Sequence, residues 1–158
     1  MRCLAVVLAL CSPPAWLPVA ALADTSLLQR YEAAHEQTDT NIDAMLISKL
    51  PELQGKTPLR AWNAVDREIG QCVLDAVALE RGPDGLEAFI AAAERFATIR
   101  FTSMTHISES TPPELYGKPL GDLMQNCGVF ERSYQLQVDS GMAAITGNLA
   151  NFSRMLAE

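Results

Sequence analysis

The stretch TPLRAWNAVDREIGQCVLDAVALERGPDGLEAFIAAAERFA, residues 57–97, decides the predicted fold. Its apolar side chains recur every three or four residues, as expected for helices that each bury one face. Thr57 and Pro58 resemble a helix start, with a capping side chain followed by a proline at the first helical position. Gly82 and Pro83 interrupt the pattern, and a new helical pattern follows them. The stretch therefore predicts two antiparallel helices joined by a tight turn.

The same helical spacing continues on both sides of this stretch. Residues 26–50 predict one helix, with a break at residues 38–41 as the open alternative. Residues 120–156 predict a last helix that bends near residues 139–141, whereas residues 101–119 lack a period and predict a surface loop. No stretch shows the sustained alternation of a strand. We therefore predict an all-α protein, a single domain over residues 24–158 that forms a bundle of four or five helices.

The first 23 residues have the organisation of a secretory signal peptide. Arg2 supplies a positive charge, and LAVVLAL at residues 4–10 is an apolar core that is too short to span a bilayer. Residues 21–23, Ala-Leu-Ala, form the small-x-small pattern that signal peptidase accepts. Cleavage is therefore predicted between Ala23 and Asp24, and the protein is predicted to be exported, either periplasmic or secreted.

The mature chain carries a net negative charge. The full sequence has 12 basic and 19 acidic side chains, and loss of Arg2 leaves 11 minus 19, or −8. This sign disfavours nucleic acid and anionic membrane surfaces as partners, because both are polyanions. No stretch after Asp24 approaches the length of a transmembrane helix, so no membrane anchor is predicted in the mature chain. A lipid on Cys11 is the alternative, which the large Leu10 before it disfavours.

Two cysteines remain after the predicted cleavage, Cys72 and Cys127. In an oxidising compartment they predict one disulfide on the inward faces of two helices, with Gly128 letting the helix backbones approach. The bond would close a loop of 127 minus 72, or 55, residues and stabilise the fold by roughly 4 kcal/mol in the chain-entropy model. A redox pair is the alternative, although redox enzymes usually hold their cysteines in a closer Cys-x-x-Cys spacing.

The polar residues of the first predicted helix suggest no catalytic site. Glu32 with Glu36 and Asp39 with Asp43 share helical faces, and both pairs are predicted to be solvated. His35 lies beside the apolar face, where a packed or half-exposed histidine is expected. Neither of the two histidines has a second His or Cys three or four residues away, so no metal and no cofactor are predicted.

The candidate partner surface lies in the predicted loop. Its apolar residues could form a groove with Trp62 or cover the end of the core. The same loop contains a His-x-x-Glu pair, His106 with Glu109. The candidate surface consists of Met104, His106, Ile107, Leu115 and Tyr116.

These observations favour a soluble, non-enzymatic protein that acts as a binding or accessory partner, most simply in a periplasm. Its expected partner is another protein or a small apolar ligand. Two alternatives stay open, a thiol-redox protein that uses Cys72 and Cys127 and a small hydrolase that uses His106 and Glu109.

Overall fold

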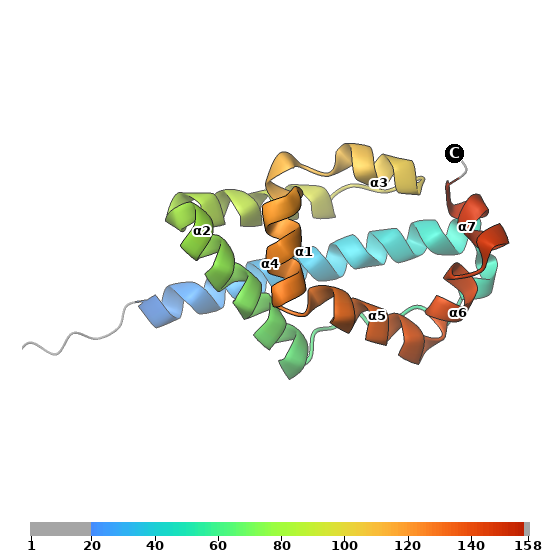
Figure 1. Cartoon of the computed structure of the whole chain (residues 1–158), viewed down its shortest axis with the longest axis horizontal. Helices are drawn as coiled ribbons and strands as arrows, with labels where there is room; N and C mark the ends of the chain where they lie inside the picture. Colours follow the sequence, from blue (N-terminus) through green and yellow to red (C-terminus); the bar gives the residue numbers. More distant parts are fainter. Residues whose placement is uncertain (1–19, 157–158) are drawn as a thin grey trace, which may run out of the picture.

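The structure, a computed structural model, describes residues 20–156, with side chains described from Ser26 onward. These residues contain helices and no strand, so the all-α prediction is confirmed (Figure 1). In chain order the elements are α1 (Ala20–Lys49), η1 (Pro51–Leu53), α2 (Ala64–Ala97), α3 (Met104–Ser110), η2 (Pro113–Leu115), α4 (Lys118–Asn126), α5 (Val129–Ser140), α6 (Met142–Thr146) and α7 (Leu149–Leu156).

The predicted signal peptide lies outside the described residues, apart from residues 20–23 at the start of α1. Cleavage between Ala23 and Asp24 therefore stays a prediction. Within residues 20–156, no helix combines the length and apolar character that crossing a membrane requires.

α1 is one unbroken helix, so the alternative of a break in its middle is wrong. Thr40 does not cap a second segment, because its hydroxyl donates to the carbonyl of Glu36 in the preceding turn at 2.8 Å. The next residue, Asn41, donates from Nδ2 to the carbonyls of Ala97 and Ile99, each at 2.9 Å. This part of α1 is thus tied to the end of α2.

α2 begins after Asn63, and the predicted start at Thr57 and Pro58 is wrong. The Asn63 side chain accepts hydrogen bonds from the backbone N–H groups of Val65 and Asp66, at 2.8 and 3.2 Å. The Asp66 carboxylate accepts in return from the Asn63 N–H at 3.0 Å. This reciprocal capping box satisfies the first turn of α2, which leaves the preceding residues free to pack on α1 in an irregular conformation.

α2 bends sharply at Gly82, where φ is 72° and ψ is −179°. Only glycine adopts such a φ readily, and Pro83 lacks an N–H for the helical ladder. The predicted interruption is confirmed, but the predicted antiparallel pair is wrong: the two limbs form an open V (Figure 1). The apolar faces of both limbs pack in one cluster with α1 and α4, and not only on each other. This shared packing accounts for the angle between the two limbs.

Residues 101–119 are not the predicted loop, because they contain α3 and η2. The Ser103 hydroxyl caps α3 by accepting from the backbone N–H of His106 at 3.0 Å. α3 has no fully buried residue, so its amphipathic signal in the sequence is weak.

Residues 118–156 form four helices, so the single helix predicted over residues 120–156 is wrong. The predicted bend at residues 139–141 is confirmed, because Gly141 has a φ of 81° between α5 and α6. Gly128 has a φ of 78° and separates α4 from α5. The segment from α4 to α7 forms a C-terminal arm. At its α7 end, Arg154 pairs with Glu52 at 2.7 Å and donates to the carbonyl of Lys49 at 2.8 Å. The arm therefore spans from α2 to the far end of α1 (Figure 1).

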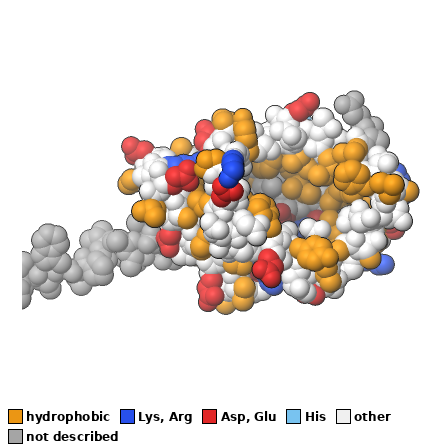
Figure 2. All heavy atoms as spheres, viewed as in Figure 1, with side chains coloured by type: hydrophobic (Ala, Val, Ile, Leu, Met, Phe, Trp, Pro, Cys, Tyr) orange, Lys and Arg blue, Asp and Glu red, His pale blue; other side chains and the backbone are white. Residues whose placement is uncertain are grey.

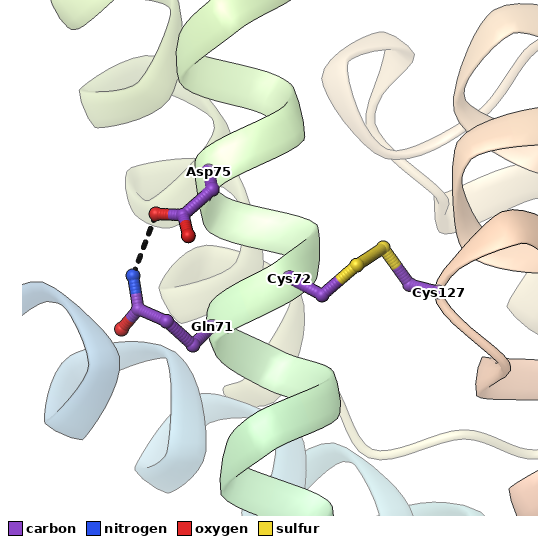
Figure 3. The surroundings of a disulfide bond; sticks show 4 residues. All are labelled: Gln71, Cys72, Asp75 and Cys127. Carbon is purple, nitrogen blue, oxygen red and sulfur yellow. Dashed lines mark hydrogen bonds between the residues drawn. A yellow bond between two sulfur atoms is a disulfide. The ribbon is translucent and has the colours of Figure 1, made fainter.

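Cys72 and Cys127 form a disulfide, with their Cα atoms 5.8 Å apart (Figure 3). The pairing is confirmed. The predicted inward placement is wrong for Cys72, which is exposed, whereas Cys127 is half-buried and packs against the core. The proposed role of Gly128 is also wrong. A β-carbon there would meet no atom within 4 Å, so glycine is needed for its positive φ and not for close approach. The bond attaches the end of α4 to the outer side of α2.

Candidate functional site

A cavity of about 240 Å³ lies between α1, residues 59–62, the first limb of α2, and α5. Its lining is mostly apolar and aromatic, with a few charged side chains among them. The lining residues are Tyr31, His35, Asp39, Leu59, Arg60, Ala61, Trp62, Asp66, Ile69, Gly70, Val73, Val129, Phe130, Arg132, Ser133 and Leu136.

Arg60 fixes one end of the cavity to α1. Its Nε atom donates to Asp43 at 2.7 Å, and Nη1 donates to Asp39 at 3.1 Å. Burial alone would lower the pKa of Arg60, but the hydrogen bonds and the charges of the two carboxylates outweigh it and raise that pKa. Asp43 is only 7% exposed, so its carboxylate depends on this guanidinium for compensation.

The other acidic pair of α1 also faces inward. Glu32 accepts two hydrogen bonds from Arg67, at 2.6 and 3.0 Å, and Glu36 accepts the backbone N–H of Trp62 at 2.8 Å. The prediction that the acidic pairs of α1 are solvated is therefore wrong. Their partners lie on residues 60–67, and four acidic side chains of α1 together hold this segment in place.

Three aromatic rings form the centre of the cavity wall. The ring centroid of Trp62 lies 5.7 Å from that of Tyr31 and 5.4 Å from that of His35, both in edge-to-face arrangements. Burial, with a smaller contribution from the charge of Asp39, raises the pKa of the Tyr31 phenol. The Tyr31 phenol therefore stays neutral at physiological pH, and Gly70 on α2 supports the ring of Trp62 from the other side.

α5 closes the cavity opposite α1. Arg132 on α5 donates from Nε to Asp66 at 2.7 Å, and both side chains are largely buried. Burial acts to raise the pKa of Asp66, but hydrogen bonds from Arg132 and from the Asn63 N–H, together with nearby positive charge, lower it overall. This ion pair and the nearby disulfide hold α5 against α2.

His35 occupies an unusual electrostatic position at the cavity. Its Nδ1 atom is buried and lies 3.3 Å from Oδ2 of Asp39, close enough for an ion pair if the imidazole is protonated. The geometry does not make a hydrogen bond, and this atom has no hydrogen-bond partner among the described residues. The His35 side chain as a whole is nevertheless 37% exposed, and it lines the cavity.

The predicted partner surface lies apart from the cavity, and none of its five residues is among the cavity lining. Met104 and Tyr116 are exposed, at 38% and 61%, whereas Ile107 and Leu115 are half-buried against the core. Figure 2 shows hydrophobic side chains gathered in a hollow beside α4 on the face that it displays. The role of these residues in binding a partner stays a prediction.

The predicted His106 and Glu109 pair is not assembled in the structure. His106 Nδ1 instead accepts from the backbone N–H of Thr102 at 3.3 Å, and its ring lies against Phe101. Among the described residues, no hydrogen bond or ion pair joins His106 to Glu109, and no group of three acidic, His or Cys side chains is placed to hold a metal.

The cavity was missed in the sequence because its walls come from three distant segments. A usable signal was present: acidic residues at positions 32, 36, 39 and 43 match basic residues at 60 and 67. No family model, curated protein or solved structure matches this chain, so functional inference depends on the cavity itself.

Proposed function

We propose that this protein is exported and acts as a non-enzymatic binding protein. In this proposal the cavity between α1, α2 and α5 holds a small, largely apolar ligand. The observation that carries the proposal is the cavity itself, about 240 Å³ in volume and lined by Tyr31, Trp62, Ile69 and Val73. Small-molecule sites are typically concave and apolar, with a few polar groups that set orientation.

The polar groups at the cavity suit structural support better than catalysis. Asp66 is held by Arg132, and its lowered pKa keeps it ionised, which is unfavourable for a general acid or base near neutral pH. Asp39 and Asp43 are both held by Arg60. A carboxylate of the cavity would have to break one of these pairs to act on a substrate.

The disulfide supports the proposal that the protein is exported, because such bonds persist outside the reducing cytosol. The thiol-redox alternative draws on one observation, the exposure of Cys72, since exchange requires an accessible sulfur. That alternative requires the protein to accelerate reduction of a disulfide substrate by dithiothreitol. The binding proposal predicts a rate no higher than that of a Cys72→Ser/Cys127→Ser variant.

Native mass spectrometry tests the binding proposal. The protein is purified without reductant from the compartment to which it is exported, and native and denatured masses are compared. We expect a native mass that exceeds the denatured mass by one small molecule, and a chain that begins at Asp24.

Two variants on α5 locate the bound molecule. Ser133 is exposed and lines the cavity, so Ser133→Phe should fill the space and abolish the additional mass. Gln135 is exposed on the same helix and does not line the cavity, so Gln135→Phe should retain it. A bound molecule that survives Ser133→Phe would place binding elsewhere, and the absence of any bound molecule would remove the support for the proposal.

A further inference from the structure

The aspartate and arginine side chains that line the cavity all have partners. Arg60 is shared between Asp39 and the more deeply buried Asp43, and Asp66 is paired with Arg132. A charged ligand would lose its hydration on entering the cavity and would meet no unpaired side chain of opposite charge. This loss is costly in a largely apolar site. The lining therefore favours an uncharged ligand.

The volume and lining of the cavity favour an aromatic ligand of limited size. A cavity of about 150 Å³ lined by apolar groups holds one benzene molecule, so the volume of about 240 Å³ suits two fused rings or one substituted ring. Tyr31, His35, Trp62 and Phe130 all contribute rings to the lining. Aromatic pairs gain more than the burial of the same area of aliphatic surface.

Two polar side chains of the lining remain available for a hydrogen bond. His35 lines the cavity from α1 and is partly exposed, and Ser133 lines it from α5. Among the described residues, the Ser133 oxygen has one hydrogen-bond contact, a long one of 3.4 Å from Gln137. A ligand with a single hydroxyl, carbonyl or N–H group would satisfy one of them.

We infer that the ligand is a neutral aromatic molecule of one or two rings that carries one hydrogen-bonding group. This inference rests on the proposed function, because it specifies the occupant of the same cavity. It excludes carboxylates and amines of the same shape, and it ranks a saturated ring below an aromatic one.

A matched series of probes tests the ligand class by isothermal titration calorimetry on the chain from Asp24. The probes are 2-naphthylmethanol, which is neutral and aromatic, 2-naphthoate, 2-naphthylmethylamine and the saturated decahydro-2-naphthylmethanol. We expect the two charged probes to bind at least tenfold more weakly than the alcohol, and the saturated alcohol to bind about tenfold more weakly. Ser133→Phe should abolish binding of the alcohol, and Gln135→Phe should leave it unchanged.

The outcomes separate the ligand class from the binding function. If a charged probe or the saturated probe binds more tightly than 2-naphthylmethanol at the same site, the ligand class is wrong and the binding function stands. If no probe binds and native mass spectrometry also finds no bound molecule, both inferences are overturned. Binding that persists in Ser133→Phe would show that the probes occupy another site and would contradict the assignment.

Discussion

The ring of Trp62 packs on the bare backbone of Gly70, where a β-carbon would stand 2.3 Å from Cζ3 and 2.6 Å from Cη2 of the indole. The absence of a side chain at position 70 is thus what lets Trp62 form the cavity wall. The chain from Asp24 contains no other tryptophan, because Trp16 lies in the predicted signal peptide. Its indole therefore reports on the cavity alone.

Gly70→Ala should destabilise the protein and weaken ligand binding. Replacing a glycine inside a helix by alanine normally stabilises by about 1 kcal/mol, but here the new methyl group must displace the indole, which costs about 1–3 kcal/mol. The matched control is Gly121→Ala in α4, where a β-carbon meets no atom within 4 Å. Urea unfolding should show opposite signs for the two variants. Equal stabilisation by both would mean that Trp62 is not held as described.

Arg60→Ala should cost far more stability than Arg67→Ala. The first change leaves the buried carboxylate of Asp43 without its guanidinium, at a cost of about 3 kcal/mol or more. Arg67 is half exposed in its pair with Glu32, where water and salt screen the charges, so its loss should cost little. Chemical denaturation of both variants measures the difference, and Asp43→Asn added to Arg60→Ala should recover part of the loss. Similar values for the two single variants would contradict the buried role of Asp43.

Asp66→Asn should destabilise the protein in a pH-dependent manner. The pKa of Asp66 is lower in the folded protein than its ordinary value of 3.8, so its ionised form stabilises the fold. This contribution is complete above the unfolded pKa and is lost as the pH falls through the folded pKa. The gap between wild type and variant, about 2 kcal/mol from the lost ion pair and weakened cap, should be constant at pH 5–8 and shrink below about pH 4. A gap that widens on acidification would rule out the ion pair with Arg132 as its source.

Removal of the disulfide should destabilise the fold and loosen the cavity. Cys72→Ser/Cys127→Ser releases a 55-residue cross-link, with an expected loss of roughly 4 kcal/mol. Because only Gly128 separates Cys127 from the start of α5, the cavity wall on α5 should also become more mobile. Hydrogen exchange of α5 amides should accelerate in the variant, while those in the second limb of α2 stay protected. Unchanged exchange in α5 would show that the Asp66 and Arg132 pair alone holds this wall.

The features that sequence patterns predicted correctly are local ones. Helical spacing identified the class of the fold, Gly82 with Pro83 identified the bend of α2, and Gly141 identified the bend after α5. Each depends on a backbone conformation that one or two residues determine. The disulfide could be predicted from the number of cysteines, because only two remain once the predicted signal peptide is removed.

The errors arose where contacts between distant segments outweigh local preference. The pair Thr57 and Pro58 has the form of a helix start, yet Arg60 and the backbone of Trp62 bind acidic residues of α1, and Asn63 provides a better cap. Gly128 ends α4 without disturbing the apolar spacing around it, so the break was not visible as a change of period. The cavity depends on all of these contacts, which is why no pattern in one segment indicated it.

The central claim is that a small molecule occupies the cavity beside Trp62, and the indole N–H resonance of this single tryptophan tests it most directly. The spectrum of the protein as purified is compared with that of protein unfolded and refolded to remove any ligand, and then with the refolded protein after its organic extract is returned. The account predicts that the resonance shifts on removal and returns with the extract. A resonance that stays the same in all three samples would contradict the claim.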